Sequence, residues 1–187
     1  MIRPTSLLLL ATALLSSAAA TAQSKAGYRI QGQLSHLPAA GARVYLRLGE
    51  QLIDSTAAVG GKFTLTGRVT EPNLYTVGVR GVDGRVELVL DNVPISIRGD
   101  ARDLWHAQVS GSAPTTAYQQ YEAQYVAPMY SQLIANSQQA AQLRARGDSL
   151  GAQQVILRNN AVMLEQYRQT KGYIRQHPAD FVSLYAL

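Results

Sequence analysis

The sequence predicts an α+β protein, with an antiparallel β-sandwich or barrel-like N-terminal part followed by an α-helical hairpin. From residue 27 to about residue 111, apolar and polar residues alternate, and Gly, Pro or Asp recurs every eight to twelve residues. After residue 111, apolar residues recur at three- and four-residue steps. We therefore divide the 187 residues into a signal peptide (1–22), a β-sandwich-like domain (23–112), and a helical hairpin with an apolar C-terminal segment (113–187).

The first 22 residues have the pattern of a secretory signal peptide. Arg3 supplies the positive charge, residues 7–15 are apolar, and the Ala20-Thr21-Ala22 segment fits the small-residue rule for cleavage. We expect cleavage between Ala22 and Gln23 and export to the periplasm, with secretion as the alternative. A membrane anchor would need about 20 apolar residues, more than this run offers. No other stretch is apolar enough to span a membrane.

The composition narrows the classes of function. The chain has no cysteine, so it can neither form disulfides nor perform thiol redox chemistry, and it cannot carry a lipoprotein anchor. Its net charge is +5, from 17 basic and 12 acidic residues. Export argues against nucleic acid as the partner. The charge favours solubility, or a weak attraction to anionic envelope polymers.

About eight short strands are expected between residues 28 and 109. The turn signals that separate them include Pro38 to Gly41, Gly60-Gly61, Glu71 to Asn73, Gly81 to Gly84 and Asp91 to Pro94. The residues expected to point inward are Tyr28, Ile30, Leu34, Val44, Leu46, Leu48, Phe63, Leu65, Val69, Tyr75, Val77, Val79, Val86, Leu88, Leu90, Ile95 and Ile97. Strands with one apolar side each imply two packed sheets or a closed barrel.

The first helix is predicted by an apolar face after residue 113. This face consists of Tyr118, Tyr121, Tyr125, Met129 and Leu133. We expect Thr115 or Thr116 to cap its start and Pro128 to kink or split it near Ala127. The tyrosines could form a stacking platform for a ligand, but the helical spacing favours packing against the sheet.

A second helix follows a short link and forms an antiparallel pair with the first. The cations and glycine at residues 144–147 are typical of a helix end, Asp148 or Ser149 can cap the next helix, and that helix stops before Pro178. Its expected apolar stripe is Ile156, Met163, Tyr167 and Ile174, flanked by Leu157 and Leu164.

The chain closes on an apolar run of residues 181–187. Such a segment either packs on its own protein or belongs to a contact with another chain. We expect a protein partner, or self-association, through this C-terminal segment.

No catalytic, cofactor or metal site is predicted from the residues. His36, His106 and His177 are far apart in the sequence and lie beside turn signals, which is untypical of a zinc site. Glu87 and Asp91 share one side of a strand, opposite its apolar side, and are expected on a solvated face. A hydrolase would instead need two carboxylates roughly 5–10 Å apart across a cleft.

A series of short motifs, specific mainly through their order, resembles a module of unknown function from exported bacterial proteins. The residues that carry it are Asp54, Ser55, Gly61, Lys62, Phe63, Gly67, Pro72, Tyr75, Gly111, Ser112 and Tyr118. The module commonly precedes a TlpA-like thioredoxin domain in thiol-disulfide oxidoreductases. The resemblance assigns these residues no catalytic role. Their chemistry is structural, because Gly61 supports a turn, Phe63 fills the core, and Asp54-Ser55 can bond to nearby backbone.

Together these observations favour a non-catalytic envelope module that binds or positions a partner, related to the N-terminal part of thioredoxin-like reductases. The thioredoxin part and its Cys-x-x-Cys motif are absent from this sequence, so it is expected to be a stand-alone module or a truncated or split product. The alternative is an independent periplasmic protein that binds a glycan or peptide in a groove between sheet and helices. Tyrosines in an open groove would favour that alternative.

Overall fold

The computed structural model of the chain describes residues 27–38 and 41–186. The predicted cleavage site at Ala22 and Gln23 lies outside the described residues, as do part of the turn after Pro38 and the last residue, Leu187. No helix in the described part of the chain is long and apolar enough to cross a membrane.

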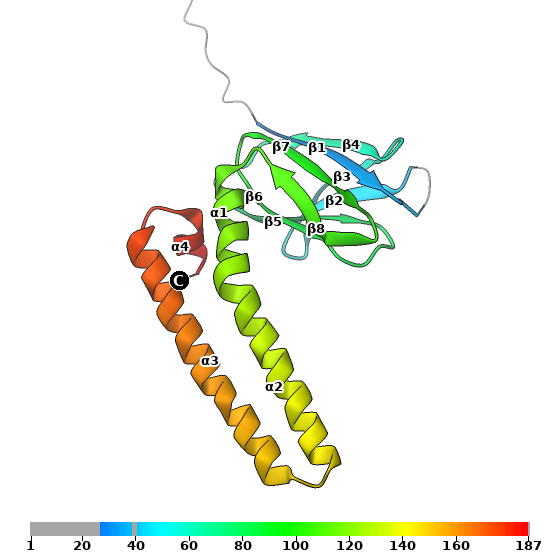
Figure 1. Cartoon of the computed structure of the whole chain (residues 1–187). Helices are drawn as coiled ribbons and strands as arrows, with labels where there is room; N and C mark the ends of the chain where they lie inside the picture. Colours follow the sequence, from blue (N-terminus) through cyan, green and yellow to red (C-terminus); the bar gives the residue numbers. More distant parts are fainter. Residues whose placement is uncertain (1–26, 39–40, 187) are drawn as a thin grey trace, which may run out of the picture.

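Eight strands form two four-stranded sheets packed face to face, and long helices follow them (Figure 1), which confirms the predicted α+β sandwich. The strands are β1 (Tyr28–Ser35), β2 (Arg43–Leu48), β3 (Gln51–Ala57), β4 (Lys62–Gly67), β5 (Asn73–Val79), β6 (Val86–Leu90), β7 (Pro94–Asp100) and β8 (Asp103–Ser110). The strand orders are β4-β1-β7-β8 in one sheet and β3-β2-β5-β6 in the other. Every pair is antiparallel except β1–β7, which is parallel. This pair forms because the chain builds the other sheet before β7 returns beside β1.

The core lies between the sheets, where the alternation seen in the sequence is realised. In β1 every second residue is buried, and β4 shows the same alternation through Phe63 and Leu65. Gly32 sits directly opposite Phe63, and a Cβ at Gly32 would come within 2.0 Å of the phenyl ring. The missing side chain of Gly32 is therefore what admits the ring of Phe63 across β1.

Helix α1 (Ala113–Tyr121) is fixed to the outer side of β6. Its N-cap is Ser112, whose hydroxyl accepts from the backbone N–H of Thr115, so the predicted caps at Thr115 and Thr116 are wrong. The Thr115 hydroxyl is instead inside the joint, where it accepts from the N–H of Val89 and donates to the Val89 carbonyl. A small polar residue next to glycine serves as the cap here, since Gly111 (φ 99°) turns the chain out of β8.

The helix continues from α1 through a π-helical segment, η1 (Glu122–Val126), into α2 (Ala127–Ala145). Pro128 lies in the first turn of α2 and has no N–H to donate, and the Ala127 N–H bonds five residues back to Glu122. The predicted split near Ala127 is wrong, because Figure 1 shows one continuous rod, and what the structure has at this place is the change of winding.

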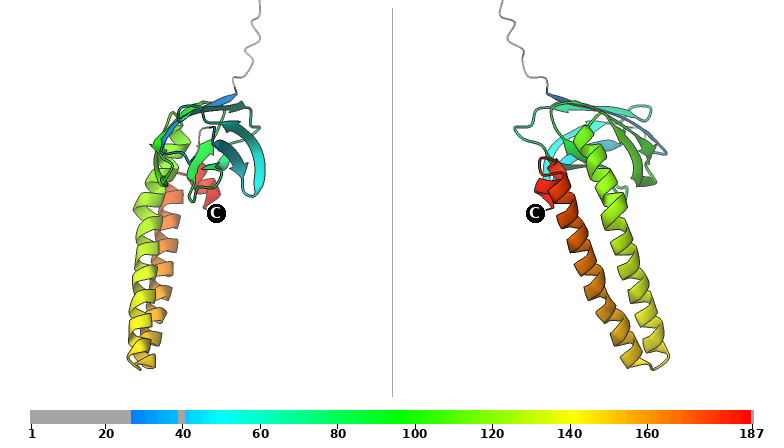
Figure 2. Two further views of the ribbon diagram at one scale, coloured as in Figure 1. Left: turned by 90° about the vertical axis from the view of Figure 1, so that its right-hand side faces the viewer. Right: turned by 60° about the vertical axis from the view of Figure 1, so that its left-hand side comes forward.

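Helix α3 (Ser149–Gln176), capped by Asp148, returns beside α2 as an antiparallel hairpin that projects from the sandwich (Figure 2). We call the residues that face each other between the two helices the seam. They are Met129, Leu133, Asn136, Ala140 and Leu143 of α2 and Ala152, Val155, Asn159, Val162 and Gln166 of α3. The stripe predicted for α3 is therefore wrong at Met163 and Tyr167, which are exposed, whereas Ile156 does pack against the seam. The seam runs one residue earlier in each turn and includes several polar residues.

A short helix, α4 (Phe181–Tyr185), docks the apolar end of the chain onto the molecule itself. Val182 is completely buried, and it packs with Val89, Tyr118 and Tyr121 in a second core between the sheet and the helices. Leu184 and Tyr185 remain exposed. The C-terminal segment thus has an internal contact that anchors it, and two apolar side chains that extend beyond that contact.

Candidate functional site

The outer face of the β3-β2-β5-β6 sheet is divided into a covered part and an open part. Strand β6 is buried on both sides, because Leu88 points into the sandwich and Val89, 0% exposed, points out under α1 and α4. Beyond α4 the same face is open and forms a hollow of about 730 Å³. We call this hollow the aromatic groove, and the lining residues used below are Tyr45, Arg47, Thr76, Arg85, Trp105 and Tyr185.

Two arginine–aromatic pairs line the aromatic groove. The Arg47 guanidinium carbon lies 5.0 Å from the centre of the Tyr45 ring, and that of Arg85 lies 4.8 Å from the Trp105 ring. Both distances suit a cation–π contact. Trp105 is 57% exposed. Since apolar rings on a protein surface cost solvation, an exposed tryptophan held beside a guanidinium is a typical binding surface.

Glycines place both rings. A Cβ at Gly78 would lie 2.7 Å from the Tyr45 ring, and one at Gly84 would lie 2.9 Å from Nε1 of Trp105. Tyr45 therefore lies across the neighbouring strand β5, and Trp105 lies against the β5–β6 turn. The sheet surface beneath the groove is kept shallow because these two positions carry no side chain.

Glu87 connects the aromatic groove to a second hollow of about 410 Å³ beneath α1. Its Oε1 accepts from Nε of Arg85 at 2.9 Å, and its Oε2 accepts from the Tyr118 hydroxyl at 2.9 Å. Burial raises the pKa of the Tyr118 phenol, and the bond to Glu87 adds to that rise. The expectation that Glu87 lies on a solvated face holds only in part, because α1 covers one side of the carboxylate and its side chain is half-buried. Asp91, at the end of β6, also has a buried carboxylate oxygen, Oδ1, without a hydrogen-bond partner in the described residues.

Glu122 lies on the other side of the Tyr118 hydroxyl. Burial raises the pKa of its carboxyl, and the negative charge of Glu87 raises it further, while the nearby Tyr118 hydroxyl works in the opposite direction. The single proton of the Tyr118 hydroxyl is donated to Glu87, and Glu122 beside it holds its own proton more tightly than an ordinary glutamate. This pair lies at the wall of the smaller hollow.

The tyrosines of the first helix form a core and no open platform. Tyr118 and Tyr121 are buried, and the Tyr121 hydroxyl is hydrogen-bonded to Thr170 of α3 at 2.7 Å. The rings of Tyr121, Tyr125 and Tyr173 lie with their centres 5.0–5.9 Å apart. This cluster holds the start of the rod against the end of α3, as the helical spacing indicated.

The residues of the sequence motif lie at structural positions spread over the sandwich. Asp54 accepts from the N–H of Ser55 on β3, and Gly61 (φ 80°) turns the chain into β4. Of the others, Lys62, Phe63 and Gly67 lie in β4, Pro72 precedes β5, and Tyr75 is buried in β5. Gly111 and Ser112 immediately precede α1, and Tyr118 is a buried residue of α1. The structure does not gather them into one site.

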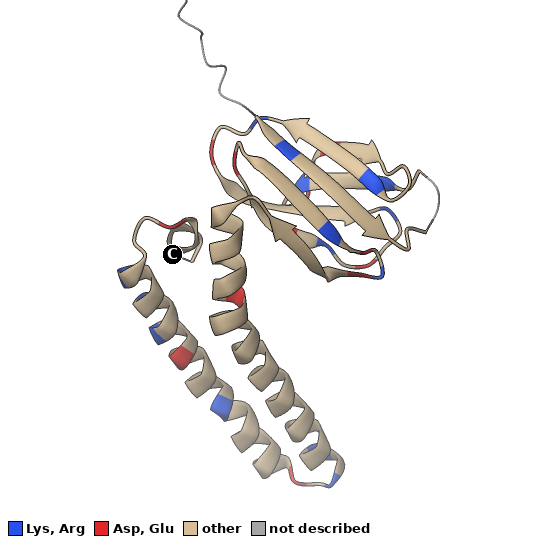
Figure 3. Cartoon of the chain, turned by 45° about the horizontal axis from the view of Figure 1, so that its top comes forward, with Lys and Arg blue, Asp and Glu red and all other residues tan. Residues whose placement is uncertain are grey.

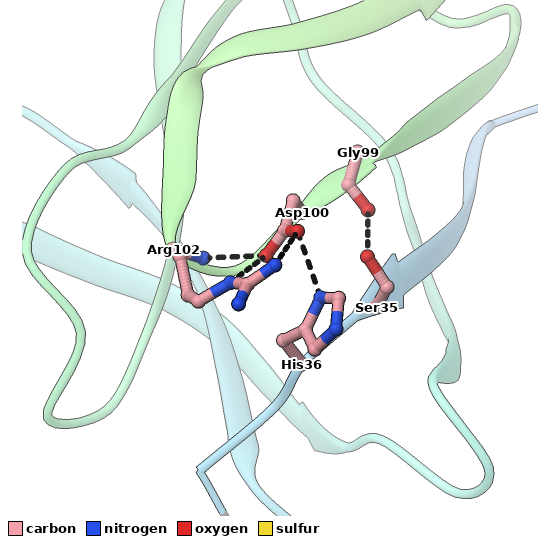
Figure 4. A network of polar contacts seen from close by, with 5 residues as sticks. All are labelled: Ser35, His36, Gly99, Asp100 and Arg102. Carbon is pink, nitrogen blue, oxygen red and sulfur yellow. Dashed lines mark hydrogen bonds and ion pairs between the residues drawn. The ribbon is translucent and has the colours of Figure 1, made fainter.

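The three histidines each pair with a nearby aspartate at the surface. Nδ1 of His36 lies 2.8 Å from Oδ2 of Asp100, which also binds the guanidinium of Arg102 (Figure 4). Hydrogen bonds from Arg102 hold the pKa of the Asp100 carboxyl well below its usual range. His106 pairs with Asp103, and His177 with Asp180. Within residues 27–38 and 41–186, no group of three or more His, Asp or Glu side chains could hold a metal ion.

The aromatic groove was not predicted from the sequence, because its residues come from β2, β5, β8, α4 and the connection between β5 and β6. One signal was present: Trp105 is the single tryptophan, and it alternates with the buried Leu104, which places it on the outer side of β8. Nothing in the local pattern indicates that Arg47 and Arg85 flank the same hollow, since they are brought together only by the order β2-β5-β6.

Fold and site together define a β-sandwich domain whose final helix extends into a projecting hairpin, with an open groove of aromatic and basic residues on one sheet. Residues 28–118 match the family model described as a domain of unknown function, DUF4369. The match covers all eight strands and the start of α1, but neither α2 nor α3. No curated protein and no solved structure matches the chain.

Proposed function

We propose that this protein is a non-catalytic binding module of the bacterial envelope, and that the aromatic groove is its ligand site. The observation that carries the proposal is the exposed Trp105 held beside Arg85, next to the matching pair Tyr45 and Arg47. Periplasmic location follows the expected signal peptide and belongs to the same proposal.

The lining favours a ligand that combines an apolar ring or side chain with a carboxylate. Aromatic faces stack against sugar rings or apolar side chains, and guanidinium groups form paired hydrogen bonds to carboxylates. Arg47 has free bonding capacity, because its described bond is a single one from Nη1 to the Glu50 carbonyl. We therefore propose a carboxylate-bearing envelope glycan or peptide as the ligand class.

A binding role agrees with the bonding of the acidic residue nearest the groove. Both carboxylate oxygens of Glu87 are already engaged, by Arg85 and by Tyr118. A general acid or base needs a free oxygen within hydrogen-bond reach of its substrate. Glu87 is therefore suited to fix Arg85 in position beside Trp105.

The single tryptophan makes the test direct. The mature chain is titrated with an acidic oligosaccharide, a neutral oligosaccharide of the same length and a short acidic peptide, while the emission of Trp105 is followed. We expect a saturable change with one of the acidic ligands, and a loss of affinity of about tenfold in Arg47→Ala, because a charge-assisted bond contributes about 1.5–3 kcal/mol. The matched control is Arg29→Ala, on the outer side of β1 in the other sheet.

Equal affinity for the neutral and acidic sugars would contradict the role given to the arginines. If none of the three ligands changes the emission of Trp105, and calorimetry detects no binding, the proposal that the groove is the ligand site is wrong. An equal effect of Arg29→Ala and Arg47→Ala would show attraction to the overall positive charge instead of recognition.

The positioning role, and the relation to the N-terminal part of thioredoxin-like reductases, is a further part of this proposal. It is supported by the order of motifs from Asp54 to Tyr118. The reading frame beyond codon 187 tests it: a stretch encoding Trp-Cys-x-x-Cys would support the relation, and a frame without one, in this gene and in neighbouring genes, would count against it.

A second candidate is acid–base hydrolysis, favoured by the raised pKa of the Glu122 carboxyl next to Glu87. It requires Glu87 to release its bond to Arg85 or to Tyr118 when substrate enters. Glycoside hydrolases use one carboxyl with a raised pKa as acid and a second as base or nucleophile. Release of reducing sugar by the mature chain, lost in Glu122→Gln, would establish it. Absence of turnover over prolonged incubation with the sugars bound in the groove would remove it.

A further inference from the structure

The hairpin has two unlike faces, and helix geometry defines which residues lie on each. One residue after a seam position lies about 100° further around its helix. Since α2 and α3 run antiparallel, equal turns in the same sense bring residues of both helices to the same side of the hairpin. The large apolar residues that follow seam positions are Tyr130 and Ile134 in α2 and Ile156, Met163 and Tyr167 in α3. Of these, Ile156 also packs against the seam, while the other four do not. We call this side the apolar face.

The apolar face is exposed in the single chain. Tyr130, Ile134, Met163 and Tyr167 are each 52–59% exposed. It includes the very stripe that the sequence pattern predicted as the buried side of α3. Apolar periodicity of this kind is selected by burial, so a stripe that does not face α2 needs another partner.

The opposite side of the hairpin is polar. The residues that precede seam positions include Gln132, Gln139, Gln142, Gln154, Arg158, Glu165 and Gln169. All of these residues are exposed, and polar and charged residues of this kind are typical of a solvent-facing surface. Both sides lie next to the seam at the same distance. The packing of α2 on α3 therefore does not explain why one side is apolar and the other polar.

Charge is also distributed unequally. Helix α2 has no charged residue before Arg144, and the only charged residues on the apolar face are Arg144 and Lys171, at its two ends. Figure 3 shows this long uncharged stretch along α2. Depletion of charge in the centre with cations at the rim is typical of an interface. It also keeps like charges out of the contact between two copies of a basic chain, whose net charge is +5 in full length.

We infer that the apolar face is the contact between two copies of this chain, whose hairpins pack into a four-helix arrangement. The 19 residues of α2 span about 28 Å, and two adjacent helices are about 20 Å wide. Two such faces in contact cover about 1,100 Å² in total, above the roughly 1,000 Å² that a stable interface needs. A two-fold contact suits this face, because it is uncharged along its centre and therefore complementary to itself.

The seam supplies an independent reason for a partner. It includes Ala140 and Ala152, which are small, and Asn136, Asn159 and Gln166, which are polar, so the two helices bury little apolar surface between them. A helical hairpin this long derives its stability from packing of its apolar sides. In the proposed dimer, the second copy covers the apolar face, which the packing of α2 on α3 leaves exposed.

The test is the mass of the mature chain in solution by sedimentation, with variants on the two sides of the hairpin. We expect a dimer for the wild type. Ile134→Glu should raise the dimer dissociation constant about 100-fold or more, because the two-fold contact brings two like charges into an apolar interface. The matched control, Gln139→Glu on the polar side, should leave it unchanged. Circular dichroism establishes that both variants keep their helices.

A second measurement uses the absence of cysteine, which gives a background-free chain for single-cysteine crosslinking. Tyr130→Cys, Ile134→Cys and Met163→Cys should yield covalent dimers on oxidation, and Gln142→Cys should not. A wild type that stays monomeric at about 100 μM, or crosslinking that favours Gln142→Cys, would overturn the proposal. So would a monomer whose apolar face is covered by a different protein.

Discussion

At the scale of single residues, Glu122 offers a test of the electrostatics under α1. Its pKa is raised in the folded chain, mainly by burial, so between its ordinary value of 4.5 and the raised value the folded state binds more protons than the unfolded state. The free energy of unfolding therefore falls as pH rises through that window. At neutral pH the charged carboxylate is a net cost to stability.

We expect Glu122→Gln to raise the melting temperature at pH 7 and to have little effect at about pH 4, where the wild-type carboxyl is protonated in both states. The amide keeps the size and polarity of the side chain beside the Tyr118 hydroxyl. Thermal unfolding followed by circular dichroism across pH 4–8 measures this. A variant that is less stable than the wild type at pH 7 would contradict the sign of the pKa shift.

Gly32 provides a residue-scale test of core packing. Replacement by alanine places a Cβ within 2.0 Å of the buried Phe63 ring, so the ring or the strand must move. We expect a loss of about 1–3 kcal/mol in the free energy of unfolding. The matched control, Gln31→Ala on the exposed side of β1, should change it by less than about 0.5 kcal/mol. Urea denaturation gives both values, and a stabilised Gly32→Ala variant would refute the account.

At the scale of elements, the asparagine pair in the seam specifies how α2 and α3 align. Nδ2 of Asn136 donates to Oδ1 of Asn159 at 2.7 Å, and Asn136 is buried. A polar pair in a helical seam fixes register at a cost in stability, because a shifted alignment leaves both amides unpaired. The pair therefore gives uniqueness to an otherwise weakly packed hairpin.

We expect Asn136→Ala to cost about 1–3 kcal/mol, since it leaves the Asn159 amide unsatisfied. The double variant Asn136→Leu/Asn159→Leu should be at least as stable as the single one, because neither amide is then left without its partner. Chemical denaturation of Asn136→Leu, Asn159→Leu and the double variant, each against the wild type, gives the coupling energy. Strict additivity of the two single changes would show that the bond contributes nothing.

The rotation of α3 shows what local pattern does and does not determine. The alternation of apolar residues predicts the buried side of each strand correctly, because a sandwich buries one side of a strand. In β1, for example, every second residue is buried. In α3 the strongest apolar stripe, Met163 and Tyr167, was assigned to the seam, yet the seam uses Val162 and Gln166 one residue earlier. The apolar pattern of a helix indicates which of its sides is suited to burial, but it does not indicate which surface packs against that side.

At the scale of the whole molecule, α4 links the chain's end to both the second core and the aromatic groove. Val182 is buried against Tyr118, while Tyr185 of the same helix lines the groove. Val182→Asp should release α4, with a loss of about 3 kcal/mol or more for a buried unpaired charge, and should weaken groove binding. Ser183→Ala, which removes only a bond to the His177 carbonyl, is the milder comparison. Hydrogen exchange of α4 amides measures the release, and unaltered exchange in Val182→Asp would contradict it.

The overall architecture could be predicted because period-two and helical spacing change at one place, near Gly111. The parallel β1–β7 pair, the aromatic groove and the Glu87–Tyr118–Glu122 cluster could not. Each of them depends on contacts between segments that are far apart in the sequence, as between Arg85 and Trp105 or between Glu87 and Tyr118. Such contacts are set by the order of strands within the sheets, which no local pattern in a single sequence records.

The unbroken rod from α1 through η1 into α2 has a consequence for how ligands are held. Its first turns are bonded to β6, so the direction of the hairpin is fixed relative to the sheet that carries the binding surface. Two chains joined along their hairpins would therefore present two identical receptors at a set spacing on a stiff frame. A polymer whose repeating units match that spacing would bind both sites of the dimer at once. The second binding event would then take place at a high effective concentration, which a monomer with one site does not provide.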